Sequence, residues 1–133
     1  LFRSAAHADE FNLTSASPEV ARERFAALDA ACRVAQRDPA AIVRSVMVGA
    51  LLGADERQFS SALERFMGRI GAAGDPESYL APRRPRWLSG TPEQAVARAR
   101  EFAAAGAQRL LVQIFLPTEI ESLDLVAAIR DRL

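Results

Sequence analysis

The clearest structural signal in the chain is the stretch Trp87-Leu88-Ser89-Gly90-Thr91-Pro92-Glu93-Gln94, which has the pattern of a strand, a turn and the start of a helix. Thr91 is a favourable N-cap, Pro92 is tolerated at the first helical position, and Gln94 can complete a capping box. Gly106 is placed to end this helix in a left-handed conformation. The apolar run 110–115 follows, as in a strand that is buried on both faces of a parallel sheet. The segment therefore predicts a strand–helix–strand unit.

The same alternation of strands and helices extends over the rest of the chain. Hydrophobic patterns predict strands at 10–13, 43–52, 87–88 and 110–115, each followed by a helix. The last helix is expected to begin at a capping box over 118–121 and to face inward with Ile120, Leu123 and Ala127. The segment 71–86, rich in Gly, Pro and Arg, is expected to form an excursion loop with one helical turn near 77–80.

Four strand–helix units define the expected fold. Strands that alternate with helices favour a parallel sheet with right-handed crossovers. We expect residues 1–133 to form one α/β domain, with the four parallel strands in sequential order and the helices packed on one side. Units of about 30 residues each would make the carboxyl-terminal half of a (β/α)8 TIM barrel of about 250 residues.

Composition limits the function classes. The 133 residues are 50% hydrophobic and 26% charged, which is typical of a globular domain. A net charge of zero gives no general attraction to nucleic acid or anionic lipid, and no apolar run is long enough to cross a membrane. The single cysteine, Cys32, fits a reducing cytoplasm. All 17 basic residues are arginine, as in proteins of GC-rich bacteria.

The residues that most often carry catalysis are scarce. His7 is the only histidine, which argues against a Ser-His-Asp triad or a histidine-based metal site. Cys32 lies on an apolar helix face and is expected to be a small core residue. The cluster Arg83-Arg84-Pro85-Arg86 is expected to be a solvated loop, with contact to an anionic cofactor tail as the alternative. No catalytic residue and no metal ligand is assigned.

Three residues near strand ends are the candidate binding residues. In a β/α barrel the active site lies at the carboxyl ends of the strands, where Asn12, Gly90 and Gln113 are expected. Gln113 stands in an apolar strand, and a buried amide needs hydrogen-bond partners. Each has a structural alternative: a turn for Asn12 and Gly90, and an internal hydrogen bond for Gln113. The missing side chain of Gly90 would also let a flat ring approach the backbone.

Several segments resemble the bacterial luciferase-like monooxygenases. The start of the chain, residues 1–13, is similar to the family stretch "LrlAArhADewN", and Arg37-Asp38-Pro39 resembles its "GRDP" turn, with Gln36 in place of the glycine. Residues 89–94 resemble the family's "vGTPeq" turn, with Ser89 in place of an aliphatic residue. Residues 106–113 match its "aGvdrvllq" approach to the last strand. The order and spacing of these segments cover nearly the whole chain.

The resemblance implies a flavin- or deazaflavin-dependent oxidoreductase or monooxygenase that uses FMN or coenzyme F-420 on a small organic substrate. It implies a cofactor site that includes Asn12, Gly90 and Gln113. The family's glycine-rich phosphate loop would stand before Leu1 and is absent from this chain. We therefore expect the isolated chain to be inactive, and to form a homodimer or to associate with an amino-terminal half. The alternative is a non-catalytic half-barrel that serves as a binding or structural domain.

Overall fold

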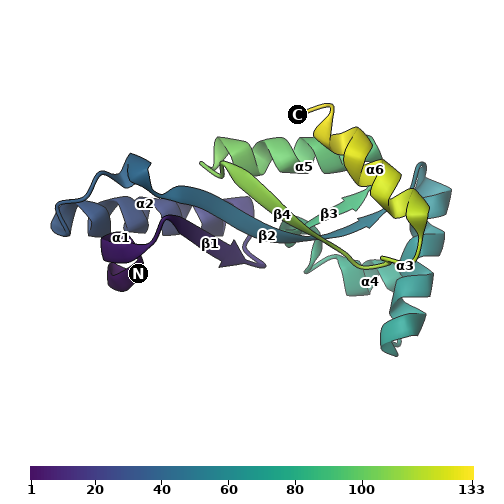
Figure 1. The fold of residues 1–133 in the computed structure, drawn as a ribbon. Helices are drawn as coiled ribbons and strands as arrows, with labels where there is room; N and C mark the ends of the chain where they lie inside the picture. Colours follow the sequence, from purple (N-terminus) through teal and green to yellow (C-terminus); the bar gives the residue numbers. More distant parts are fainter.

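The computed structural model describes all residues, 1–133, and shows four parallel strands with helices between them (Figure 1). The strands are β1 (Glu10–Thr14), β2 (Val43–Leu52), β3 (Trp87–Gly90) and β4 (Arg109–Ile114). The helices are α1 (Phe2–His7), α2 (Pro18–Val34), α3 (Glu56–Ile70), α4 (Pro76–Leu80), α5 (Pro92–Ala104) and α6 (Ile120–Arg130), with short 3-10 turns at η1 (Pro39–Ala41) and η2 (Arg84–Arg86). The predicted α/β alternation is confirmed, and α4 is the helical turn expected inside 71–86.

Local sequence signals explain where the helices begin. Ser17 caps α2 by accepting a hydrogen bond from the Val20 N–H at 3.3 Å, and Asp55 caps α3 by accepting from the Gln58 N–H at 2.7 Å. At α5 the Gln94 side chain accepts a hydrogen bond from the Thr91 N–H at 2.9 Å, as in the predicted capping box. These caps place the helix starts directly after the strands that precede α3 and α5.

The strand order differs from the sequential order that the sequence predicts. β2 pairs with β1 through residues 43–47, with β3 through 49–52 and with β4 through 45–50. Because β4 overlaps both other strands along β2, β1 and β3 share one edge of β2 and β4 occupies the other. The prediction that β4 lies beside β3 is therefore wrong. β3 has four residues and β2 has ten, so β2 alone offers β4 a long edge to pair with.

One face of the sheet packs against α2, α5 and α6. In β2, Val46, Val48, Ala50 and Leu52 point to this face, since alternate residues of a strand share a side. They form the main core with Phe25 of α2, Leu88 of β3, Ile129 of α6 and four residues of α5: Ala95, Val96, Ala99 and Phe102. This is the largest apolar cluster in the structure, and burial of its side chains is the main contribution to folding.

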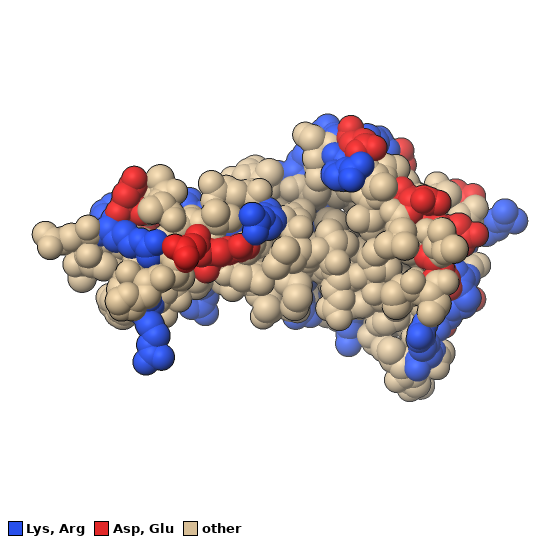
Figure 2. Space-filling model, viewed as in Figure 1, with Lys and Arg blue, Asp and Glu red and all other residues tan.

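The opposite face is covered only at its carboxyl end. Leu51 points to this side and packs with Phe59, Leu63 and Phe66 of α3 and with Leu80 of α4. Helices therefore lie on both sides of the sheet at this end, which corrects the expectation of helices on one side. The remainder of this face is open. Figure 2 shows mainly uncharged atoms over the middle of the molecule, where β2 and β4 lie in Figure 1.

The last strand and helix depart from their predicted burial. β4 alternates between exposed and half-buried residues, so it is not buried on both faces. No side chain caps α6, whose N-cap is Glu119, and the expected capping box over 118–121 is absent. Ile120 and Leu123 are exposed, whereas Ile129 is buried. The α6 face that meets the core is therefore the one that carries Leu125, Val126 and Ile129, and the predicted inward face is wrong.

Three further sequence features have a clear place. Cys32 is fully buried in a small cluster between α1, α2 and Ile42, which confirms it as a core residue. His7 lies exposed in the last turn of α1. Gly106 has a φ of +99° just after α5, as predicted for the end of that helix. None of the helices is both long and apolar enough to span a bilayer.

Candidate functional site

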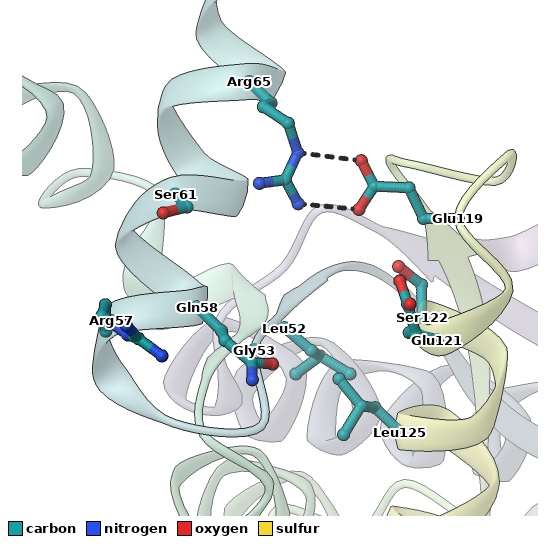
Figure 3. A pocket seen from close by; sticks show the side chains of 10 residues that line it. All are labelled: Leu52, Gly53, Arg57, Gln58, Ser61, Arg65, Glu119, Glu121, Ser122 and Leu125. Atoms are coloured by element: carbon teal, nitrogen blue, oxygen red, sulfur yellow. Dashed lines mark hydrogen bonds and ion pairs between the residues drawn. The ribbon is translucent and has the colours of Figure 1, made fainter.

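A polar pocket lies at the carboxyl end of β2, where α3 begins and α6 approaches (Figure 3). Its volume is about 520 Å3. The strand end contributes Leu52 and Gly53, α3 contributes Arg57, Gln58, Ser61 and Arg65, and the α6 side contributes Glu119, Glu121, Ser122 and Leu125. In α/β proteins the carboxyl ends of parallel strands are where ligands most often bind.

Gly53 allows α3 to start close to the end of β2. A Cβ on Gly53 would lie 2.1 Å from the Phe59 nitrogen and 2.6 Å from the Gln58 carbonyl carbon, so only glycine fits this contact with the helix backbone. The Gln58 side chain then accepts a hydrogen bond from the Ala54 N–H at 3.3 Å. These contacts fix the first turn of α3, and therefore the position of Arg57, an exposed residue at the side of the pocket.

Arg65 and Glu119 form the wall of the pocket opposite the strand. Arg65 Nε donates to Glu119 Oε1 at 3.0 Å and Nη2 donates to Oε2 at 2.9 Å, as the dashed lines in Figure 3 show. This two-point geometry is the strongest form of an ion pair between these groups. It raises the pKa of Arg65 and lowers the pKa of Glu119. Both groups therefore stay charged near neutral pH, and the pair ties α3 to the start of α6.

Arg57 is the positive group of the pocket that has no acidic partner. Its guanidinium takes part in none of the ion pairs or side-chain hydrogen bonds of the structure, whereas Arg65 is neutralised by Glu119. Ser61 and Ser122 add hydroxyl groups that can donate or accept. Arg57 and these hydroxyls can bind an anionic oxygen group such as a phosphate, whereas the Glu121 carboxylate of the same pocket disfavours one. The sequence does not reveal this pocket, because its residues come from three separated segments.

The three sequence-predicted site residues are not brought into one cluster. Asn12 stands beside Ser45 of β2, Gln113 beside Gly49, and Gly90 beside Leu52. At about 3.3 Å per residue, the Asn12 and Gly90 positions are roughly 23 Å apart along β2. Asn12 and Gln113 share the open face of the sheet and both are exposed. Gln113 is therefore not the buried amide that its apolar surroundings suggested.

Gly90 has a structural reason for being glycine. Its φ is +109°, and a Cβ there would lie 1.7 Å from Oε1 of Gln94, the atom that completes the capping box of α5. The turn alternative from the sequence therefore accounts for this residue. Gly90 is buried at the end of β3, beside the end of β2.

An aromatic cluster fills the sheet face between Gln113 and the polar pocket. The ring of Phe115 stacks on Phe66 with centroids 4.9 Å apart and lies 4.5 Å from the Trp87 ring. Arg83 stacks on the ring of Tyr79 at 3.8 Å, Arg84 pairs with Glu77 at 3.0 Å, and Arg86 donates to the Pro82 carbonyl at 3.2 Å. The arginines of the 71–86 segment therefore make contacts within that segment, and the sequence-based alternative of a cofactor contact gains no support from them.

Comparison with solved structures shows that several enzymes share the fold of this chain. No protein-family model and no curated protein sequence matches the chain. Among solved structures, the long-chain alkane monooxygenase LadA is similar with a TM-score of 0.72 and 12% identity, over 98% of this chain and 38% of that one. EDTA monooxygenase from Chelativorans sp. BNC1 has a TM-score of 0.69 and 14% identity, over 98% of this chain and 44% of that one.

A deazaflavin enzyme shows the same likeness. An F-420-dependent secondary alcohol dehydrogenase in complex with an F-420–acetone adduct has a TM-score of 0.62 and 12% identity, over 86% of this chain and 39% of that one. The chain thus spans about two fifths of the length of these structures. Identities this low show a shared fold. The chain therefore has the α/β fold of these three enzyme structures, and its sequence resembles the luciferase-like monooxygenases.

Proposed function

We propose that the chain is the carboxyl-terminal half-barrel of a luciferase-like oxidoreductase or monooxygenase that uses FMN or coenzyme F-420. The observation that carries this proposal is the polar pocket at the carboxyl end of β2, with Arg57 unpaired. Both cofactors carry a phosphate group, which suits the unpaired guanidinium and the hydroxyls of Ser61 and Ser122. The shared fold with flavin and deazaflavin enzymes supports the same function.

The remaining cofactor contacts are proposed on the open face of the sheet. Gln113 is exposed there beside Gly49, roughly 10 Å along β2 from Leu52, and its amide can both donate to and accept from the polar edge of a flavin or deazaflavin ring. Asn12 stands beside Ser45, roughly 23 Å from the same strand end, which is farther than a flavin ring lies from its phosphate, so Asn12 is left out of the proposed site. When bound, the cofactor supplies hydride transfer or oxygen activation towards a small organic substrate. The protein supplies binding and orientation. This division explains why no catalytic residue has to come from the chain itself.

Flavin titration of the full gene product that contains residues 1–133 tests the proposal. Arg57→Gln removes the phosphate contact, and a charged hydrogen bond of about 1.5–3 kcal/mol corresponds to roughly 10- to 100-fold weaker FMN binding. Riboflavin lacks the phosphate, so its affinity is expected to stay the same in this variant. Arg22→Gln, an exposed and unpaired arginine on α2, is the matched control.

Contacts to the flavin ring can be distinguished from the phosphate contact by comparing the affinities for FMN and riboflavin. Gln113→Ala is expected to weaken FMN and riboflavin equally, because both contain the same ring, and Asn12→Ala is expected to leave the binding of both unchanged. Gly90 is a poor probe, since any side chain there would disturb the Gln94 cap. Equal loss of FMN and riboflavin in Arg57→Gln would contradict the phosphate assignment. Unchanged binding in Gln113→Ala would remove this residue from the site.

The second candidate function is a non-catalytic half-barrel that binds or supports another protein. The aromatic cluster of Phe66, Trp87 and Phe115 favours it, because these rings cover the sheet face next to the strand ends where a flavin ring would lie. A folded gene product that binds neither FMN nor coenzyme F-420 at high concentration would support this alternative over the enzyme.

A further inference from the structure

A second cavity lies on the helical side of the sheet, between α5, α6 and the amino end of β4. Its volume is about 510 Å3, which is within the range of small-molecule sites. Its walls are apolar and include Ala99 and Ala103 of α5, Leu110 and Val112 of β4, and Val126 and Ile129 of α6. It lies apart from the polar pocket at the carboxyl end of β2, and the two cavities share no residue.

The polar part of this cavity is made of donors. Its lining contains three arginines and Gln108, and no acidic residue. Arg109 is held by Glu10 at 2.8 Å and Arg130 by Asp131 at 2.7 Å. Arg100 has no acidic partner, and one of its nitrogens donates to the Arg132 carbonyl at 3.1 Å. The cavity therefore combines apolar walls with one guanidinium that is free to bind an anion.

Gln108 adds a second donor at the same end. Its Oε1 accepts a hydrogen bond from the Arg44 N–H at 2.9 Å, which leaves the side-chain NH2 group available. An occupant must match both parts of the cavity: a hydrocarbon part for the walls and an acceptor-only, negatively charged head for Arg100 and Gln108. A carboxylate has this property, and planar guanidinium groups bind carboxylates in two-point geometry.

We propose that the cavity between α5 and α6 binds a small amphiphile with a hydrocarbon chain and a carboxylate head. The head contacts Arg100 and Gln108, and the chain lies against Ala103 and Ile129. The affinity comes from burial of the hydrocarbon chain, and the selectivity comes from the arginine, since neutral or cationic heads gain nothing from it.

Calorimetric titration with octanoate, octanol and octyltrimethylammonium tests the proposal. Octanoate is expected to bind best, and Arg100→Gln to weaken it by about tenfold or more while it leaves octanol unchanged. Ala103→Phe fills the cavity from an exposed helix position and is expected to abolish binding of octanoate. Arg22→Gln on α2 is the control that keeps octanoate affinity.

Three outcomes would overturn the proposal. Equal binding of the three amphiphiles would show that the head is not recognised. Absence of octanoate binding at millimolar concentration, with an unchanged circular dichroism spectrum, would show that the cavity is not a ligand site. A dimer that dissociates in Ala103→Phe would assign the cavity to a second copy of the chain. Flavin titrations report on the other pocket, so the two proposals fail separately.

Discussion

Phe115 packs directly on Gly49: a Cβ added to Gly49 would lie 2.1 Å from Cζ of Phe115 and 2.5 Å from Cε2. Gly49 lies in the middle of β2, opposite both Trp87 of β3 and Gln113 of β4. Because Gly49 has no side chain, the ring of Phe115, which follows β4, can pack directly on the backbone of β2. This contact separates the open part of the face from the part that α3 covers.

We expect Gly49→Ala to lower the free energy of unfolding by about 1–3 kcal/mol, because overpacking of this size forces the ring to move. The ring cannot move freely, since it stacks on Phe66 and touches Trp87. Urea denaturation measures the change. Adding Phe115→Leu should make the effect of Gly49→Ala smaller, as contacting residues are not additive.

Gly68 provides the control for this prediction. It lies within α3, and a Cβ there would meet nothing within 4 Å. Gly68→Ala is expected to raise the free energy of unfolding by about 0.5–1 kcal/mol, because alanine is the better helix former. Similar losses in Gly49→Ala and Gly68→Ala would show that the Phe115 contact is not the cause.

The turn after α2 contains a strained residue. Gln36 has a φ of +53°, in the left-handed region that disfavours side chains, and its side chain makes no hydrogen bond. The luciferase-like monooxygenases that the sequence resembles have glycine at this position of the "GRDP" turn. We expect Gln36→Gly to raise the free energy of unfolding by up to about 1 kcal/mol, since relief of the strain exceeds the extra entropy of glycine in the unfolded chain.

If strain at Gln36 is the cause, the same substitution at the neighbouring Ala35 should change the free energy of unfolding in the opposite direction. Ala35 has a φ of −78°, so it gains no relief from glycine. Ala35→Gly is expected to lower the free energy of unfolding by about 0.5–1 kcal/mol. Thermal denaturation of the two variants measures both changes, and a loss of stability in Gln36→Gly would refute the strain at this turn.

The Arg65–Glu119 pair predicts a pH dependence of stability. The guanidinium lowers the pKa of the Glu119 carboxyl, so its contribution is fully present above the unfolded pKa of about 4.3 and is lost as the pH falls through the lower folded pKa. Arg65 is half exposed, so the contribution is at most about 1 kcal/mol. Glu119→Gln should lower stability at neutral pH by this amount, and the difference should shrink in acid.

Urea titrations of the chain and of Glu119→Gln, near pH 7 and near pH 3, measure this difference. Glu64→Gln is the control, because Glu64 lies exposed on α3 without an ion pair. Its effect is expected to be small at both pH values. A Glu119→Gln difference of the same size at both pH values would mean that packing, not the charge, causes it.

The sequence predicts what is determined locally. Helix starts at Ser17, Asp55 and Thr91 follow from side chains within three residues of each start. The helical spacing of Phe59, Leu63, Phe66 and Ile70 predicts an inward face for α3, which the structure confirms for the first three, whereas Ile70 is exposed. The alternation of strands and helices then favours a parallel sheet, which the structure confirms. These features need no knowledge of distant segments.

What the sequence leaves open depends on contacts between distant segments. β4 pairs with β2 across about 60 residues of intervening chain, and nothing in residues 109–114 specifies that partner. The exposure of Gln113 follows from this pairing and not from its apolar neighbours. The polar pocket could not be predicted for the same reason, since Arg57 and Ser122 come together only through the packing of α3 and α6.

The free edge of β4 leads to the last prediction, on association. β4 pairs with β2 alone, so its other edge has no strand beside it, and residues 110–114 carry no charge. Leu111 is 38% exposed. An uncharged, unpaired edge is a template for another strand. We propose that this edge associates with a second copy or with an amino-terminal half-barrel. Phe115, which follows this strand, packs against the cluster around Phe66 and is not part of the edge.

Sedimentation of residues 1–133 at tens of micromolar measures this association. We expect dimers or larger assemblies together with weak FMN binding, because the isolated chain supplies only half of the proposed site. Leu111→Lys places a charge on the edge and should weaken association by tenfold or more, since natural edge strands use lysine to block pairing. Val34→Lys, at an exposed position on α2, should leave it unchanged. A stable monomer that binds FMN tightly would contradict the half-barrel interpretation, since such a chain would need neither a partner strand nor a second half of the site.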